Sequence, residues 1–315
     1  MVLEQFCNST EVEKRQATED QPYLFNQTRF RLFIKMSFEG DPSLEYLNSY
    51  MEKLYNPFNV EFDLLSTIRY DPNLTPAPPS SASDITRQNF FLFKEHFQRL
   101  LFTLKYFQIQ MSEEDEKDAG NFSVTEDFIL ERLIESIDRS PLSVTQPMKI
   151  RMLVSLQGEL KIELYTTPER PNLLEAVKNR DGVDINAGDI WDVRIDSEQT
   201  LISPFTSFKT TNRSVHTAAR NRGIPGLKPG LEEVIMVNQE NMAMEGSITN
   251  IAIKRDGAWV TPDLSSGCLC GVVRHYLLHE KFLNEGKIHK SELSPGTEVL
   301  LFNGVMGLVR GYIVD

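Results

Sequence analysis

The apolar positions divide the chain into a mixed first part and a strand-rich second part. In the first part they recur at the three- and four-residue spacing of one helix face, at Phe97, Leu100, Leu101, Leu104 and Phe107. A second helical stretch is predicted over 125–137. A short polar segment at Ser140–Pro147, with a proline near each end, separates the two parts. It predicts a domain boundary.

After this boundary the pattern is typical of short strands. Gln157-Gly158 and Asp256-Gly257 each lie between two apolar runs, and both dipeptides predict the turn of a hairpin. Further strands are expected at 191–195, 233–238, 298–303 and 307–314, with a helix at 271–282. We therefore expect an α+β (mixed α/β) fold of two domains. These are a smaller N-terminal α+β domain over 1–147 and a larger strand-rich domain over 148–315.

Composition and charge limit the partners. The 315 residues carry a net charge of -12, which repels nucleic acid and anionic membranes. No run of eighteen apolar residues occurs, and the first residues lack the apolar stretch of a secretory signal. Cys268 and Cys270 have no further Cys or His at ligand spacing, so no metal site is expected. We expect a cytoplasmic protein that binds a small molecule, with local arginines if that molecule is an anion.

The segment 203–220, SPFTSFKTTNRSVHTAAR, contains the most informative chemistry. Its four basic residues have the spacing of one helix face: Lys209, Arg213, His216 and Arg220. A solvated basic face is one interpretation. Phe205 and Phe208 favour another, in which apolar surroundings lower the pKa of Lys209 and prepare its amine to form a Schiff base. The residue pattern leaves both open.

This segment resembles the Lys-Thr-Thr-x-Arg stretch of class IV pyridoxal-phosphate enzymes. Further segments resemble the same family in the same order and extend over most of the chain: FDLLSTIRYDP (62–72), FLFKEHFQR (91–99), MEGSITNIAI (244–253), GCLCGVVR (267–274) and LLFNGVMG (300–307). The resemblance implies a two-domain enzyme with the active site in the cleft between the domains. It also implies a homodimer, which is typical of the class. The acidic segment 111–121 and the Pro/Ser-rich segment 71–83 could instead block that surface and leave a monomer.

The resemblance further implies pyridoxal 5'-phosphate as cofactor, with Lys209 as the Schiff-base lysine. Glu245 would lie against the pyridine nitrogen and keep it protonated, which deepens the electron sink; an exposed turn glutamate is the alternative. The phosphate would be held by one arginine and by two backbone segments able to bind an anion: Arg99, the turn Ser247, Ile248 and Thr249, and the helix start Gly271, Val272 and Val273. Val273 stands where the family usually has Thr, and His216 where it often has Tyr.

The segments at 62–72 and 91–99 resemble the lyase branch of the family, including fungal members. That branch converts 4-amino-4-deoxychorismate to 4-aminobenzoate and pyruvate in folate biosynthesis. Lys209 would act as general base and then as acid, and Thr67 is a second candidate for protonating the leaving group. Two substrate carboxylates call for arginines, and the candidates are Arg151, Arg69 and Arg213.

Arg151 is the first choice, because strand alternation points it away from Ile150 and Met152. An ion pair with a surface acid is the alternative for this arginine. For the whole chain, the alternatives are a class IV aminotransferase of branched-chain or D-amino acids and a catalytically inactive binding member. The presence of Lys209, Glu245 and Arg99 together argues against the last.

Overall fold

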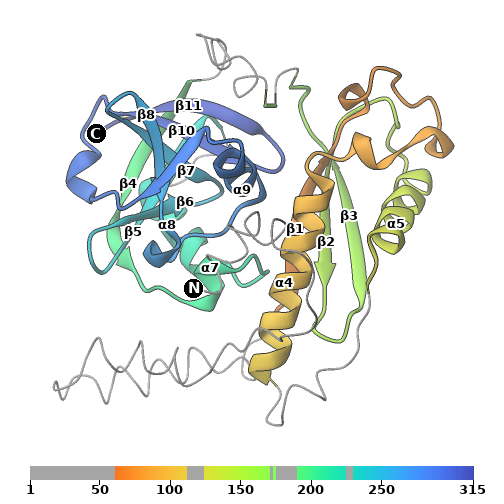
Figure 1. Cartoon of the computed structure of the whole chain (residues 1–315), viewed down its shortest axis with the longest axis horizontal. Coiled ribbons are helices and arrows are strands. Elements are labelled where there is room, and N and C mark those ends of the chain that lie inside the picture. The colour runs from red at the N-terminus through yellow and green to blue at the C-terminus, as the bar shows by residue number, and fades with distance from the viewer. Residues whose placement is uncertain (1–60, 112–123, 171–172, 175–189, 225–229) are drawn as a thin grey trace, which may run out of the picture.

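The computed structural model describes residues 61–111, 124–170, 173–174, 190–224 and 230–315. These residues form two sheets and the helices that cover them (Figure 1). The predicted N-terminal tail and residues 112–121 of the predicted acidic segment lie outside this part of the chain. No helix within it is long and apolar enough to cross a membrane.

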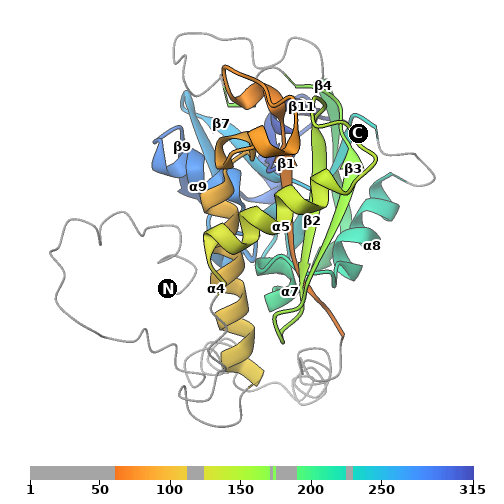
Figure 2. The ribbon, with the colours of Figure 1, turned by 90° about the vertical axis from the view of Figure 1, so that its right-hand side faces the viewer.

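The smaller sheet is antiparallel, in the order β1 (Leu64–Tyr70), β2 (Met148–Val154) and β3 (Leu160–Thr166). Gly158 closes the turn between β2 and β3 at φ 89°, a conformation that glycine adopts without steric cost. The helices α4 (Phe93–Met111) and α5 (Glu126–Asp138) lie against this sheet, and in Figure 2 α5 crosses in front of the strands while α4 runs beside them. Between β1 and α4 lie three short 3-10 helices, at Pro72–Leu74, Ala82–Asp84 and Arg87–Asn89.

One face of this sheet is apolar and forms a core with the two helices. The residues that share this core include Ile68, Tyr70, Met148, Ile150, Met152, Phe93, Phe97, Ile129 and Leu133. The alternate residues, among them Thr67 and Arg151, point to the opposite face, because successive side chains of a strand alternate. Polar groups are therefore left facing the larger sheet.

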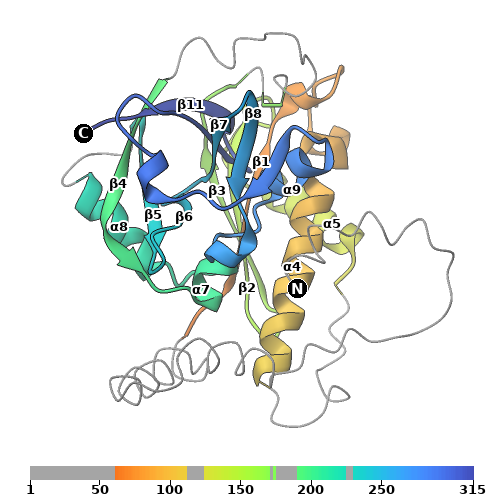
Figure 3. The same cartoon turned by 60° about the vertical axis from the view of Figure 1, so that its left-hand side comes forward.

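The larger sheet has eight strands in the order β6-β5-β4-β11-β10-β7-β8-β9. Their bounds are β4 (Ile190–Thr200), β5 (Glu232–Asn238), β6 (Ala243–Gly246), β7 (Asn250–Arg255), β8 (Ala258–Pro262), β9 (Leu283–Gly286), β10 (Glu298–Asn303) and β11 (Gly307–Ile313). Three neighbouring pairs are parallel, β4–β5, β4–β11 and β8–β9, and the others are antiparallel. The sheet curls, so that β6 also approaches β7 and β8 (Figure 3).

Helices close the ends and sides of the curled sheet. They are α7 (Pro204–Ser207), α8 (Ser214–Gly223) and α9 (Val272–His279), with 3-10 helices at Leu264–Ser266 and Lys290–Glu292. α8 packs against β4 and β5, whereas α9 packs against β9, β10 and α4. The contact between α4 and α9 joins the two halves beside the smaller sheet.

The fold class is confirmed, and so are the predicted hairpins, which correspond to β2–β3 and β7–β8. The predicted boundary between 147 and 148 needs correction. Because β2 pairs with β1 over its whole length, from Met148 opposite Tyr70 to Val154 opposite Leu64, the first sheet continues to Thr166. The two sheets are separated after β3.

The predicted helix face that joins Lys209, Arg213, His216 and Arg220 is also wrong for its first residue, Lys209, which is not helical. α8 begins only at Ser214, with Arg213 at its N-cap, and Lys209 and Thr210 lie before it in a segment that pairs with β1. The Leu65 N–H donates to the Lys209 carbonyl at 2.9 Å, and the Thr211 N–H donates to the Asp63 carbonyl at 2.9 Å. The β-branched Thr210-Thr211 pair suits this extended conformation better than a helix.

Candidate active site

Lys209 lies where the segment after α7 crosses the start of β1. Among the described residues its amine has no hydrogen bond and no ion pair. Burial lowers the pKa of Lys209 well below its ordinary value, and the positive charges of Arg213 and Arg99 lower it further, against the opposing effect of Glu245. A lowered pKa makes this amine easier to deprotonate than an exposed lysine, which suits a nucleophile or base.

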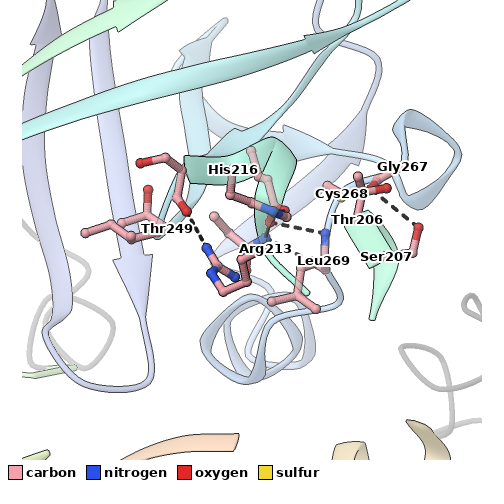
Figure 4. Close-up of polar contacts among 12 residues, drawn as sticks. Thr206, Ser207, Arg213, His216, Thr249, Gly267, Cys268 and Leu269 are labelled. Carbon is pink, nitrogen blue, oxygen red and sulfur yellow. Dashed lines mark hydrogen bonds and ion pairs between the residues drawn. The ribbon is translucent and has the colours of Figure 1, made fainter. Parts of the chain in front are cut away.

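Glu245, on β6, is buried, and three donors fix its carboxylate. His216 on α8 contributes its Nε2, 3.0 Å from Oε1. Oε2 accepts hydrogen bonds from the Leu269 backbone N–H at 3.2 Å and from Asn250 Nδ2 at 3.3 Å. Figure 4 shows His216 and Leu269 side by side, with Arg213 close to them. Donors to both oxygens hold the carboxylate in one orientation.

Asn250 connects this carboxylate to the start of α9. Its Nδ2 also donates to the Leu269 carbonyl at 2.9 Å. A Cβ added at Gly271 would lie 1.9 Å from Asn250 Oδ1, so this position accepts no side chain while Asn250 stays in place. Gly271 is the N-cap of α9 without a capping side chain, and the first backbone N–H groups of a helix have no partner within it. Val272 and Val273 can offer such N–H groups but no hydroxyl.

Arg99, on α4, is a buried cation with 6% of its surface exposed. Within the described part of the chain its guanidinium has no hydrogen bond and no ion pair. Burial lowers the pKa of Arg99 to about 10, and Glu245 opposes this effect only in part. Arg99 and the N-terminus of α9 lie on neighbouring helices. A buried guanidinium and free helix N–H groups are the donor set that a phosphate requires.

The turn from Ser247 to Thr249 binds a carboxylate of the protein itself. Glu233, fully buried on β5, accepts from the Ser247 N–H at 3.0 Å and from the Ser247 hydroxyl at 2.6 Å through Oε1. Through Oε2 it accepts from the Ile248 N–H at 3.2 Å and from the Thr249 hydroxyl at 2.8 Å. These donors of the turn are therefore already bound to Glu233. A role of these three residues toward a cofactor phosphate stays a prediction.

Arg151 faces Lys209 rather than the helices. Thr67, Arg151 and Glu163 are register partners on β1, β2 and β3, and register partners share a face of the sheet. The charge of Arg151 contributes to lowering the pKa of Lys209, which places the guanidinium near the amine. Arg151 NH1 donates to Glu163 Oε2 at 2.8 Å, and a third of its side chain is exposed. Both interpretations of this residue therefore apply: it faces the site, and it pairs with an acid.

The other two arginine candidates differ in how far they are already engaged. Arg69 has no exposed surface, and all its nitrogens are paired: with Asp71 at 2.7 and 2.8 Å, with the Val305 carbonyl at 3.3 Å and with the Pro168 carbonyl at 2.9 Å. The buried guanidinium thus joins three chain segments, and every one of its nitrogens already has a protein partner. Arg213 donates to the Ser247 carbonyl at 2.5 Å and lies close enough to Lys209 to lower the pKa of its amine.

Sequence reasoning missed three participants. Asn250 and the Leu269 N–H lie inside segments that resemble the family, yet their contact with Glu245 follows only from the three-dimensional arrangement. Glu233 gave a weaker signal, as a carboxylate at the start of an otherwise apolar strand. No sequence pattern indicates that its partners come from the turn after β6.

Comparison with known proteins agrees with this geometry. The family model described as amino-transferase class IV matches residues 84–311. The chain belongs to the class IV aminotransferase family. It is 34% identical over 266 residues to aminodeoxychorismate lyase of Saccharomyces cerevisiae, an alignment that covers 72% of this chain and 68% of the yeast protein.

Two solved structures show the same fold. The branched-chain amino acid aminotransferase of Escherichia coli superposes with a TM-score of 0.57 at 16% identity, over 82% of this chain and 78% of that one. The 4-amino-4-deoxychorismate lyase of Pseudomonas aeruginosa gives 0.52 at 16% identity, over 80% and 81%. Aminotransferases and lyases share this architecture, so the fold alone does not select the reaction.

Proposed function

We propose that this protein is a pyridoxal-phosphate-dependent lyase that converts 4-amino-4-deoxychorismate to 4-aminobenzoate and pyruvate. The observation that carries the proposal is the buried amine of Lys209, whose pKa is lowered well below its ordinary value and which lies within electrostatic reach of both Glu245 and Arg99. The similarity to the yeast lyase, at 34% identity, supports the choice of reaction.

The residues present fit pyridoxal phosphate. Arg99 and the backbone N–H groups at Val272 and Val273 would bind the phosphate, which gives the buried guanidinium the anion that it lacks among the described residues. Glu245 would accept a hydrogen bond from the pyridine nitrogen, and Lys209 would be the attachment point. When bound, this cofactor supplies an electron sink for the carbon that carries the substrate amine.

Lys209 has the properties of a residue that moves a proton. Its lowered pKa lets the amine take the C4 proton of the substrate at neutral pH, and the resulting ammonium can return a proton to the departing enolpyruvyl group. Thr67 faces the same side as Arg151 and is the second candidate donor for this protonation. Loss of the C4 proton and of enolpyruvate leaves the aromatic product, and the enolpyruvate becomes pyruvate on protonation.

Arg151 would bind one substrate carboxylate. In the structure its partner is Glu163, whose carboxylate also contacts Lys161 at 2.9 Å and the Tyr165 hydroxyl at 3.1 Å. Because Glu163 keeps these two other partners, it can release Arg151 without becoming an isolated charge. A substrate carboxylate can then exchange for Glu163 on the guanidinium, where a bidentate geometry is available.

Two linked measurements test the proposal. Protein loaded with pyridoxal phosphate is reduced with borohydride and digested, and peptide mass mapping should find the pyridoxyl group on the peptide that contains Lys209. In parallel, wild-type protein should form 4-aminobenzoate from 4-amino-4-deoxychorismate, and Lys209→Ala should not. Label on another lysine, or full activity of Lys209→Ala, contradicts the proposed site.

A further inference from the structure

His216 makes a direct contact with the carboxylate expected to hold the cofactor ring. It lies on α8, 5% exposed, with Nε2 at 3.0 Å from Glu245 Oε1. Its other ring nitrogen, Nδ1, is buried and has no hydrogen-bond partner within the described part of the chain. The resemblance to the family gave no role for a histidine at this position.

The surroundings of His216 determine its protonation state. Burial lowers the pKa of His216; the charges of Arg213 and Lys209 act in the same direction, and the contact with Glu245 opposes them. A neutral imidazole has one N–H, and a carboxylate can only accept, so the proton lies on Nε2 and points at Glu245. The ring therefore donates a hydrogen bond without adding another full charge beside Arg213.

The hydrogen bonds to Glu245 leave room for one more donor. Oε2 accepts from Leu269 and Asn250, whereas Oε1 accepts from His216 alone among the described residues. A carboxylate oxygen has two lone-pair directions, so Oε1 retains one. His216 fixes the rotation of the carboxylate about its last bond and thereby directs the remaining acceptor position.

We infer that His216 is a positioning residue for the cofactor ring: as an Nε2–H donor it aims the Glu245 carboxylate at the pyridine nitrogen, so that the ring nitrogen stays protonated. The inference rests on the proposed function, because it presupposes that Glu245 faces the ring. The inference gives His216, on α8, a role in orienting Glu245, which the sequence motifs alone do not indicate.

Two variants separate the hydrogen bond from the packing. His216→Phe keeps an aromatic ring of similar size but removes the donor, whereas His216→Gln places an amide N–H close to the position of Nε2. His279→Phe is the control, since His279 is half-exposed at the C-terminal end of α9 and contacts Glu280 rather than Glu245. Cofactor retention on dialysis and the melting temperature of each protein without cofactor show whether the fold has changed.

The decisive readout is the protonation of the cofactor ring, measured by NMR on pyridoxal phosphate with an isotopically labelled ring nitrogen. In His216→Phe the pH at which this nitrogen loses its proton should fall by about one to two units, as expected for the loss of one hydrogen bond to a charged group. kcat should fall by roughly ten- to a hundredfold with KM nearly unchanged. His216→Gln should restore most of both, and His279→Phe should equal wild type.

The outcomes distinguish the inference from the proposed function. An unchanged ring-nitrogen titration in a folded, cofactor-bound His216→Phe protein overturns the role of His216 and leaves the lyase proposal intact. If Glu245→Gln also leaves that titration unchanged, Glu245 does not contact the ring, and the proposed site is wrong. An equal defect in His216→Phe and His216→Gln means that the imidazole acts through its packing, and this also overturns the inference.

Discussion

Replacing Arg99 by methionine should have opposite effects on the protein with and without cofactor. Without an anion, Arg99 is a buried charge with no ion pair among the described residues. Its pKa of about 10 lies below the ordinary value of a guanidinium, so the charged form is less favourable in the folded than in the unfolded chain. At 1.36 kcal/mol per pH unit, this lowering corresponds to about 3 kcal/mol of destabilisation, present at every pH below the folded-state pKa.

Methionine removes this cost and fills a similar volume with apolar atoms. We therefore expect Arg99→Met to raise the melting temperature of the cofactor-free protein by about 6 °C, since 1 kcal/mol corresponds to about 2 °C for a chain of this size. The same change removes a charge-assisted contact to the phosphate, which contributes about 1.5–3 kcal/mol. The dissociation constant for pyridoxal phosphate should then rise roughly ten- to a hundredfold.

Thermal unfolding with increasing pyridoxal phosphate measures both effects in one experiment. Wild-type protein should gain more stability from the cofactor than Arg99→Met does, because ligand binding to the folded state stabilises it in proportion to the logarithm of affinity. Arg132→Met is the control, since Arg132 is exposed on α5 and pairs with Glu135 there. A cofactor-free Arg99→Met protein that is less stable than wild type would show that Arg99 supports the fold itself.

Three further predictions concern the other basic residues. Arg151→Ala should raise KM for 4-amino-4-deoxychorismate roughly ten- to a hundredfold, with Arg151→Lys in between, and a KM within about twofold of wild type in steady-state assays would contradict the assignment. Arg69→Ala should lower the free energy of unfolding by about 3–5 kcal/mol in urea titrations, because it leaves Asp71 buried without its partner; a rise in KM at unchanged stability would instead make Arg69 a substrate ligand. Because the pKa of Lys209 is lowered well below its ordinary value, the rate of cofactor attachment to the cofactor-free protein should reach its plateau at a lower pH than for an exposed lysine; a tenfold rise per pH unit that continues up to the ordinary lysine pKa would contradict this.

The local features of the fold could be predicted from the sequence. Gly158 and Gly257 have positive φ at the predicted turns, and each turn connects neighbouring strands of a hairpin. The boundary was missed because the pairing of β1 with β2 joins residues about eighty positions apart, and no local pattern records it. The same holds for Lys209, whose conformation is determined by its contact with β1 rather than by helical spacing.

The sequence predicted candidate site residues by their type and by the motifs that contain them, but not their contacts. The motifs identified Lys209 and Glu245, and strand alternation gave the correct face for Arg151. Strand alternation could not show which of Arg151 and Arg69 is available to a substrate. Only the structure shows that every nitrogen of Arg69 already has a protein partner. Two of the three donors around Glu245, His216 and the Leu269 N–H, come from segments distant in sequence, and their contact could not be predicted. Cytoplasmic location and a homodimer stay predictions.

The most direct test of the central claim is the release of pyruvate from 4-amino-4-deoxychorismate without any 2-oxo acid acceptor, followed continuously with lactate dehydrogenase. A lyase restores its cofactor in each cycle, so pyruvate should accumulate over many turnovers, in equal amount to 4-aminobenzoate. An aminotransferase transfers the amine to its cofactor and stops after one turnover per site. Pyruvate that accumulates without acceptor supports the lyase; activity that appears only with an added amino acid and 2-oxo acid pair contradicts it.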